Sequence, residues 1–325
     1  MSVRILFTGV NSGIHKMSAT DAELPSIAER LGHYLCLDIF DSPDVVICVD
    51  YDNRYKTLLL DAQASGVPLA LVKQEPPVVN LSHRWENPSG LFNLVISRAK
   101  ADQAPQFPAA QNWDVRLLTR DSRLNKIVAI SADKWSSVPG ELYSLRRKMY
   151  AHDSRIELFG RGWTDNNWKR FQRVIKELMI AVRHGIVPKL TNLPFAFIKP
   201  LDFKGVAEDK MEVLSRYHAA LVIENDPTSL SEKVVDCLLA GTIPVYVGPP
   251  TSSFGIPEGL IIRSKADVSS LTSALDLALE TDSQEFRSMA WSWASQDTSR
   301  EHWSSESVGA RLITHIVRKT VKSSA

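Results

Sequence analysis

The chain has 325 residues, of which 44% are apolar and 23% are charged, as is typical of a soluble globular protein of about two domains. Thirty-eight Lys and Arg residues stand against 37 Asp and Glu residues, which leaves a net charge of +1 and no general basic field to attract nucleic acid. An anionic ligand must therefore be held by a local site. The composition also excludes disordered, collagen-like and coiled-coil chains.

The N-terminal residues enter a strand pattern directly, without the basic segment or cleavage site of a secretory signal. The longest apolar runs, such as 43–49, are far shorter than the ~20 residues of a membrane-spanning helix. We therefore expect a cytoplasmic protein with at most peripheral contact with the inner face of a membrane. Cys36, Cys48 and Cys237 lie in apolar runs at no metal-ligand spacing, so we expect buried free thiols.

Short apolar runs alternate with amphipathic segments along the whole chain. The strands expected from the apolar runs are, in chain order, 3–8, 34–38, 44–49, 68–72, 92–97, 127–131, 155–159, 219–223, 243–247 and 260–262. The helices expected from the amphipathic segments are 22–32, 55–64, 140–150, 167–184, 231–240, 267–280, 284–295 and 304–321. This alternation is typical of α/β proteins with parallel sheets, whose ligands bind at the carboxyl ends of the strands.

The alternation is interrupted at 101–111, where two prolines and the lack of a hydrophobic period indicate a linker or a long loop. We therefore predict two Rossmann-like, doubly wound domains, 1–115 and 120–300, that face a central cleft. Residues 301–325 add a C-terminal helix that we expect to pack back on the N-terminal domain.

The segment 217–248 is the most informative part of the chain and reads as a strand, a polar loop, a helix, a turn and a strand. Ser231 is expected to cap the helix at its N-terminus, and Gly241 is expected to end it. A helix N-terminus offers unpaired N–H groups and a positive dipole end, which suit a diphosphate. Lys233 adds a positive charge in the first turn, and Glu232 could accept hydrogen bonds from sugar hydroxyls.

This segment resembles the donor motif of glycosyltransferase family 10, the α-1,3/4-fucosyltransferases. The family's Phe-Glu-Asn, Thr-Glu-Lys and Ala-Gly-Thr-Val-Pro-Val are matched by Ile223-Glu224-Asn225, Ser231-Glu232-Lys233 and Ala240-Gly241-Thr242-Ile243-Pro244-Val245. Just upstream, Lys204-Gly205 and Asp209-Lys210, followed by Leu214 and Tyr217, extend this similarity. More moderate similarities are found at Gln74-Glu75-Pro76-Pro77, at 91–98 and at Phe159-Gly160-Arg161. The resemblance spans about 70–250 and is strongest over 204–248.

The resemblance implies a GT-B fold and an inverting transfer of fucose from GDP-fucose, the nucleotide-sugar donor, to a hydroxyl of a glycan or glycolipid acceptor. It implies donor contacts at Arg146 or Arg147, Arg161, Lys204, Tyr217, Glu224, Asn225, Ser231, Glu232 and Lys233. It also implies that no metal cofactor is required and that Mn²⁺ or Mg²⁺ is at most stimulatory. Asp50 and Asp52 match the Asp-x-Asp pattern of a metal-binding pair, but they lie in the N-terminal domain, where we expect no donor site.

An in-line displacement at the anomeric carbon needs a base that takes the proton of the acceptor hydroxyl. Glu75 follows the carboxyl end of a predicted strand in the N-terminal domain, and two prolines after it stiffen the loop. The family has its general base at such a Glu, so we expect Glu75 to be the base, with Glu86 in reserve.

Two departures from the family pattern leave other functions open. Glu224 and Glu232 are eight residues apart, a spacing that matches the paired Glu residues of retaining GT-B transferases. The family's Arg before the Gly-Arg motif has no unambiguous counterpart, and Arg146 and Arg147 lie nearest to it. A GT-B transferase for another nucleotide sugar, inverting or retaining, and a non-catalytic carbohydrate- or nucleotide-binding relative are therefore the alternatives.

Overall fold

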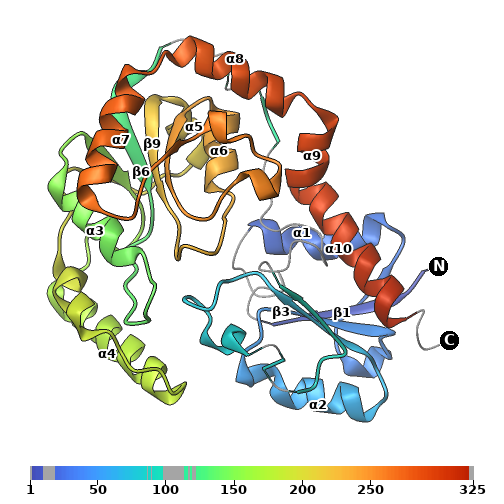
Figure 1. The fold of residues 1–325 in the computed structure, drawn as a ribbon. Helices are drawn as coiled ribbons and strands as arrows, with labels where there is room; N and C mark the ends of the chain where they lie inside the picture. Colours follow the sequence, from blue (N-terminus) through green and yellow to red (C-terminus); the bar gives the residue numbers. More distant parts are fainter. Residues whose placement is uncertain are drawn as a thin grey trace. The chain divides into compact units, whose positions relative to one another are not determined.

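The computed structural model describes residues 2–9, 19–85, 87–88, 90–97, 113–115, 118 and 122–321. The chain divides into two compact units, which are drawn in Figure 1. The N-terminal unit consists of Met1–Asn112 and Arg300–Ala325, and the C-terminal unit of Trp113–Ser299. The linker or loop predicted at 101–111 lies outside the described residues.

The N-terminal unit is built on a five-stranded parallel sheet with the strand order β2-β1-β3-β4-β5. Its strands are β1 (Arg4–Thr8), β2 (Tyr34–Cys36), β3 (Val45–Val49), β4 (Leu69–Lys73) and β5 (Leu94–Ser97). Its helices are α1 (Ala19–Arg30), α2 (Lys56–Ala64) and α10 (Ser305–Thr320).

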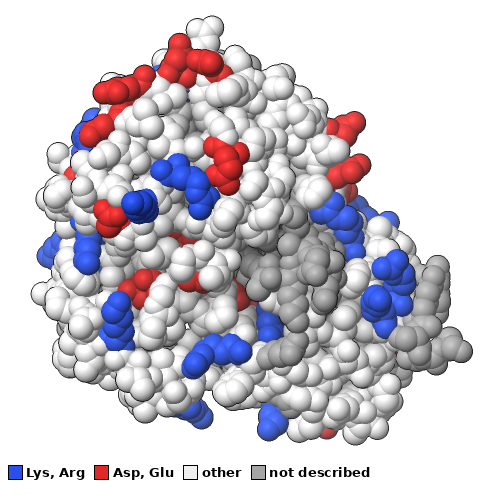
Figure 2. Space-filling model, in the orientation of Figure 1, with Lys and Arg blue, Asp and Glu red and all other residues white. Residues whose placement is uncertain are grey.

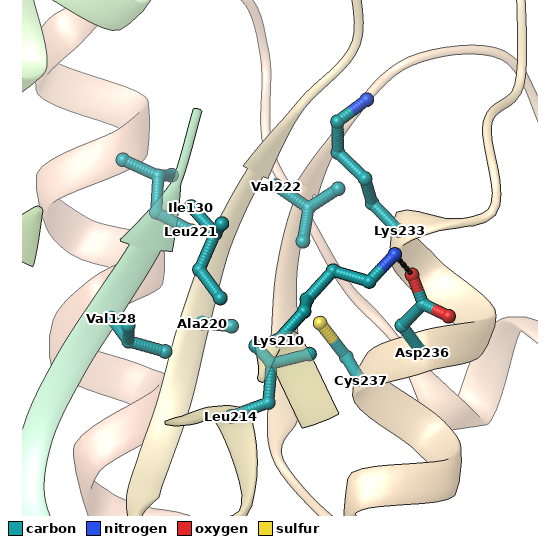
Figure 3. Close-up of a pocket in the computed structure, with 10 residues that line it drawn as sticks. All are labelled: Val128, Ile130, Lys210, Leu214, Ala220, Leu221, Val222, Lys233, Asp236 and Cys237. Carbon is teal, nitrogen blue, oxygen red and sulfur yellow. Dashed lines mark ion pairs between the residues drawn. The ribbon is translucent and has the colours of Figure 1, made fainter. Parts of the chain in front are cut away.

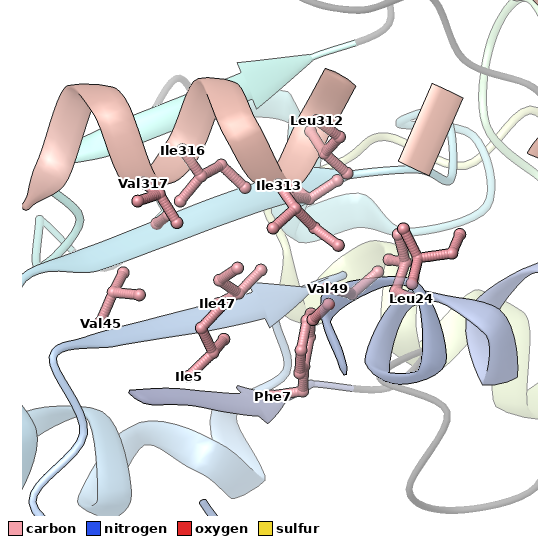
Figure 4. Packing of buried hydrophobic residues seen from close by; sticks show 14 of the residues in the cluster. Ile5, Phe7, Leu24, Val45, Ile47, Val49, Leu312, Ile313, Ile316 and Val317 are labelled. Atoms are coloured by element: carbon pink, nitrogen blue, oxygen red, sulfur yellow. The ribbon is translucent and has the colours of Figure 1, made fainter. Parts of the chain in front are cut away.

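Both faces of the middle of this sheet are covered, so successive side chains of β1, β3 and β4 are buried although they point to opposite faces. Ile5 and Phe7 of β1 pack with Ile313 and Ile316 of α10 on one face, in the cluster drawn in Figure 4. Leu6 faces the opposite side and packs in a second cluster with Leu59 of α2 and with β3 and β4. The period-two alternation of a strand therefore explains why the sequence shows continuous apolar runs here.

The C-terminal unit is built on a six-stranded parallel sheet with the strand order β11-β10-β9-β6-β7-β8. Its strands are β6 (Leu124–Ile130), β7 (Ile156–Phe159), β8 (Phe203–Gly205), β9 (Tyr217–Ile223), β10 (Ile243–Val247) and β11 (Ile262–Arg263). The helices that begin in this unit are α3 (Tyr143–His152), α4 (Asn167–Arg183), α5 (Lys210–Ser215), α6 (Lys233–Ala240), α7 (Val268–Glu280), α8 (Ser283–Ala294) and α9 (Asp297–Trp303).

The predicted α/β class with two parallel-sheet domains is confirmed. Every strand and helix expected from the sequence is present, with its ends shifted by three residues or fewer. The sequence patterns do not reveal β8, α5 or α9, which contain three, six and seven residues. Elements this short contain too few residues for a hydrophobic period to be recognised in their sequence.

The three cysteines are buried free thiols. Within the described ranges, no helix combines the length and the apolar character that crossing a membrane requires.

Candidate functional site

Polar side chains gather at the carboxyl edge of the C-terminal sheet, where β9 ends and α6 begins. Glu224 follows β9 directly and is only 1% exposed, and its backbone N–H still bonds Val247 O of β10 at 2.9 Å. Its carboxylate accepts a hydrogen bond from the backbone N–H of Ser231 at 2.8 Å. Glu224 therefore closes the base of the loop 225–230, and it is an internal part of the site rather than an exposed ligand group.

Lys233 connects this carboxylate to the start of α6. Its Nζ lies 3.7 Å from Glu224 Oε2 and donates to Ser231 Oγ at 2.9 Å. The side chain is 27% exposed, so part of the ammonium group still reaches solvent. Because an ammonium carries three donors, Lys233 retains capacity for an anionic ligand.

Ser231 is not the N-cap that the sequence predicts. The helix begins one residue later than a Ser231 cap would require, and Glu232 occupies the N-cap position in a helical conformation. Glu232 makes no side-chain capping bond, and Ser231 instead donates its N–H to Glu224 and accepts a hydrogen bond from Lys233 at its hydroxyl oxygen. The first N–H groups of α6 are thus left without a capping side chain, an arrangement that favours an anion at this terminus. The predicted end of the helix at Gly241 is confirmed by its left-handed φ of 67°.

Arg146 and Arg147, which the sequence could not tell apart, have different environments on α3. Arg146 is buried, and it donates to Ile223 O at 2.8 Å and to Asn225 Oδ1 at 2.9 Å. It therefore fixes the end of β9 and orients the Asn225 side chain. Arg147 instead forms an ion pair with buried Asp133.

Arg147 belongs to a structural cluster under α4 rather than to the edge formed by Glu224. Its guanidinium also donates to the backbone carbonyls of Lys134 and Ala196 and lies 5.0 Å from the ring centre of Trp163. Burial lowers the pKa of Arg147, and Asp133 partly opposes this shift. All of this makes Arg147 unsuited to reach a diphosphate at α6.

Arg161 follows β7, whose carboxyl end shares a sheet edge with that of β9. Its side chain is exposed, and it makes no ion pair with the residues described. The preceding Gly160 has a φ of 154°, and a Cβ there would lie 1.8 Å from Ser131 O. The Gly-Arg pair therefore requires glycine for close packing of the backbone, and the arginine side chain after it is exposed to solvent.

Lys204 and Tyr217 both contact Glu157 rather than Glu224. Tyr217 is the first residue of β9, whereas Glu224 follows its last residue, which places them about 20 Å apart at ~3.3 Å per residue. The Tyr217 hydroxyl donates to Glu157, and Lys204 Nζ lies 3.5 Å from the same carboxylate. Burial and Glu157 raise the pKa of Tyr217. Tyr217 therefore lies at the other end of the sheet, whereas Lys204 lies on the edge strand β8 beside the end of β7 and contacts Glu157.

A buried ion pair lies directly beneath the candidate donor edge and does not follow from the sequence motifs. Lys210 Nζ is 2.5 Å from Asp236 Oδ2 and 3.9 Å from Glu232 Oε1. Figure 3 shows Lys210, Lys233 and Asp236 around a cavity of about 30 Å³, whose other walls are apolar side chains of β6, β9, α5 and α6. The acidic Asp236 within the apolar face of α6 is the one sequence signal that could have revealed this pair.

The pKa values of both partners are raised, because burial has the larger effect on Asp236 and the neighbouring carboxylates together have the larger effect on Lys210. Burial raises the pKa of Asp236 to about 6, although Lys210 opposes the shift. Burial also tends to lower the pKa of Lys210, but Asp236 and Glu232 outweigh it and raise that pKa to about 12. Asp236 is 2% exposed, so it carries most of the desolvation penalty.

In the N-terminal unit, Glu75 follows the carboxyl end of β4. The backbone N–H groups of Gln74 and Glu75 donate to Asp50 Oδ1 at 2.8 and 3.1 Å. His83 Nδ1 lies 2.6 Å from Glu75 O, and its Nε2 lies 3.4 Å from Asp50 Oδ1. The backbone of Glu75 is thus fixed from two sides, whereas its carboxylate is half-buried and forms no hydrogen bond or ion pair with a described side chain. The reserve candidate, Glu86, lies outside the described residues.

Asp50 and Asp52 do not converge on a common point. Asp50 supports the Glu75 loop, while Asp52 pairs with Arg54 at 2.9 Å and caps the turn that follows β3. Among the residues that the structure describes, no group of three or more His, Cys, Asp or Glu side chains could hold a metal ion.

No family model matches the chain, and no curated protein sequence matches it. Similarity is found among solved structures. The Anabaena protein HepE in complex with UDP-glucose has a TM-score of 0.60 and 13% identity over 97% of this chain and 99% of its own. An α-glucosyltransferase in complex with UDP and DNA has a TM-score of 0.53 and 14% identity over 94% of this chain and 96% of its own.

An α1,3-fucosyltransferase has a TM-score of 0.50 and 12% identity over 98% of this chain and 91% of its own. At these identities the likeness concerns the fold alone. The chain therefore has the fold of the GT-B glycosyltransferases, with two Rossmann-like parallel-sheet units.

Proposed function

We propose that this protein is a glycosyltransferase that takes its sugar from a nucleotide-diphosphate donor bound at the carboxyl edge of the C-terminal sheet. The observation that carries the proposal is the convergence of Glu224, Asn225 and Lys233 with the uncapped start of α6. The similarity of this same segment to the donor motif of family 10 supports GDP-fucose as the donor and a glycan or glycolipid hydroxyl as the acceptor.

In this proposal the diphosphate binds at the N-terminus of α6, where Lys233 and the backbone N–H groups of the first turn meet its charge. Arg146 keeps Asn225 in place, so that Asn225 and Glu232 can contact hydroxyls of the ribose or the fucose. Negative charge on the diphosphate grows as its bond to the sugar breaks, so positive charge at this position stabilises the transition state more than the bound donor. Such a difference in stabilisation raises the rate of transfer, whereas equal stabilisation of both states would only tighten binding.

Glu75 is proposed as the general base. Its carboxylate takes the proton of the acceptor hydroxyl while that oxygen attacks the anomeric carbon, and the bond from this carbon to the diphosphate oxygen breaks. A single displacement of this kind inverts the configuration at the anomeric carbon. The support for Glu75 is its fixed backbone together with a carboxylate that no described side chain engages.

One alternative function is supported by a specific observation. Glu224 and Glu232 are eight residues apart, the spacing of the paired Glu residues in retaining GT-B transferases. This alternative predicts a donor other than GDP-fucose, such as a UDP-sugar, and retention of configuration.

Thermal unfolding with a panel of nucleotides separates these functions, because a ligand of the folded state raises its apparent stability. GDP should raise the melting temperature more than UDP, ADP or CMP at equal concentration. A larger shift with UDP would instead favour the retaining alternative. Binding of GDP without transfer or hydrolysis of GDP-fucose would point to a non-catalytic binding protein.

The proposed site meets the phosphate charge with Lys233 and a helix terminus, so a metal is not required. Turnover should persist in excess EDTA, with at most a modest loss. Complete loss that Mn²⁺ restores would contradict this part of the proposal.

A further inference from the structure

Helix α4 (Asn167–Arg183) has a stripe of apolar side chains on its exposed side. Trp168, Phe171, Ile175, Met179 and Val182 recur at intervals of three or four residues and are between 39% and 68% exposed. The rings of Trp168 and Phe171 stack on one another with their centres 5.8 Å apart. These five residues, called here the α4 stripe, form a continuous apolar band along the helix.

The opposite face of α4 already has its packing partners. Val174 packs against Trp135 and Ala196, and buried Arg170 donates to Ile198 O at 3.1 Å. The helix is therefore anchored to the C-terminal unit through other residues, and the α4 stripe is not needed for this packing. Exposed apolar surface that is continuous rather than scattered marks an interaction site.

A basic row runs beside the α4 stripe. Lys169, Lys176 and Arg183 are exposed and spaced by seven residues, so they lie almost in line along the helix. Figure 2 shows the surface over α4 as mostly white, with blue Lys and Arg atoms among the white. The one acidic residue of the helix, Glu177, is half-buried, and burial raises its pKa. Just before the helix, Asp165 Oδ1 lies 3.7 Å from Lys169 Nζ and compensates part of that charge. The exposed side of α4 is thus apolar on one flank and mainly cationic on the other.

We propose that the α4 stripe and its basic row form a docking surface for an anionic phospholipid membrane. A helix with large apolar side chains on one face and Lys or Arg on its flank lies in the plane of a bilayer interface, with its apolar face among the acyl chains. Long basic side chains reach the phosphate groups while their methylene stems remain in the apolar layer.

The size of the surface favours a bilayer over a second copy of the chain. A 17-residue helix is about 25 Å long, and a stripe ~10 Å wide along it covers roughly 250 Å². A stable protein–protein interface buries about 800 Å² on each partner, and repulsion between two basic rows would oppose self-association. A lipid surface needs no matching shape, and its negative charge complements the basic row.

Vesicle co-sedimentation of the full chain tests this proposal. The protein should bind vesicles of phosphatidylcholine with phosphatidylglycerol, and it should bind pure phosphatidylcholine and high-salt samples much less. Lys169→Gln/Lys176→Gln/Arg183→Gln should lower the partition coefficient roughly 100-fold, at about fivefold for each basic residue near an anionic surface. Trp168→Gln/Met179→Gln should lower it about tenfold or more, because two large apolar groups no longer insert.

Matched controls carry the same chemical changes away from α4. Leu37→Gln/Phe40→Gln alters two apolar residues that are 90% and 89% exposed, and Lys56→Gln/Lys265→Gln/Arg318→Gln removes three exposed charges. Both controls should bind vesicles like the wild type, and all variants should melt at the wild-type temperature because the altered side chains are exposed.

Three results would overturn the proposal. The wild type could fail to bind anionic vesicles, or the α4 variants could bind as well as the controls. Alternatively, light scattering could find a wild-type dimer that the α4 variants convert to monomers, which would make a second copy the occupant of the stripe.

Discussion

The carboxyl edges of the two sheets hold their glutamates in opposite ways. At the C-terminal edge, the carboxylate of Glu224 is buried and bonded to Ser231 N–H, with Lys233 nearby. At the N-terminal edge, Asp50 and His83 hold only the backbone of Glu75. A carboxylate whose hydrogen bonds are already formed shapes a binding site. A carboxylate on a fixed backbone, with no hydrogen bond to the side chains that the structure describes, is suited to proton transfer.

The largest effect that we expect comes from Glu75→Gln, which keeps the shape of the side chain and removes its basicity. The kcat should fall by ~10²–10⁴-fold, the usual contribution of general-base catalysis, while the Kd for the nucleotide stays nearly unchanged. Steady-state kinetics and nucleotide titration measure both quantities. Glu29→Gln, at an exposed Glu of the same unit, is the control. A near wild-type rate for Glu75→Gln would move the search for the base to Glu86.

The next largest effect concerns the support beneath the C-terminal edge. Removing one partner of a buried ion pair costs ~3–5 kcal/mol in typical cases. Lys210→Met leaves Asp236 buried without its cation, but Lys210 is 27% exposed, so we expect a loss of about 2–3 kcal/mol in unfolding free energy at pH 8. Urea unfolding measures this loss, with exposed Lys265→Met as the control.

A double variant separates the ion pair from a general packing defect. Lys210→Met/Asp236→Leu replaces both charges with apolar groups, which should restore most of the stability because no buried charge is left unpaired. If the double variant were less stable than Lys210→Met alone, the pair would not explain the loss.

Lys233→Ala tests the binding side of the comparison. It removes a charge-assisted contact worth ~1.5–3 kcal/mol in typical cases, so nucleotide affinity should fall by roughly tenfold or more. Isothermal titration with GDP measures the change, and Lys265→Ala serves as the control. Should Lys233→Ala and Glu75→Gln weaken nucleotide binding equally, the division of roles between the two edges would be wrong.

The smallest effect is a pH dependence of stability that arises from Asp236. Burial raises its pKa from 3.8 to about 6, so between about pH 4 and 6 the folded chain holds a proton that the unfolded chain has lost. This contribution to the unfolding free energy is complete below pH 4 and decreases as the pH rises through 6, by about 1–3 kcal/mol. Asp236→Asn should lack this pH-dependent contribution. If the unfolding free energies of the two proteins, measured by urea unfolding from pH 4 to 8, changed in parallel with pH, Asp236 would not be the group responsible.

Much of the fold follows from local sequence patterns. The central strands, such as β3, are buried on both faces and are recognised as apolar runs in the sequence. Helices such as α4 and α10 carry a buried stripe at a helical period. The motif around Glu224 and Lys233 is also local, since the loop, the helix start and Gly241 lie within one strand–helix–strand unit. Residues that act together within about 20 positions can be recognised as a group from the order of the amino acids alone.

Other features depend on contacts between distant segments. Arg146 and Arg147 are neighbours in the sequence, but successive side chains on a helix point about 100° apart, so one meets Asn225 and the other meets Asp133. Tyr217 belongs to the same motif as Glu224, yet the length of β9 places it at the opposite end of the sheet.

The two parallel-sheet units, the order of their elements and the motif around Glu224 and Lys233 can be predicted from the amino-acid order, because hydrophobic period and turn chemistry are properties of short segments. Three features are visible only in the folded chain: which arginine holds Asn225, the pairing of Lys210 with Asp236, and the support of the Glu75 loop by Asp50 and His83. Each of these contacts joins side chains from separate elements. Which side chains meet depends on how the elements pack against one another, and the sequence immediately around any one residue does not reveal this packing.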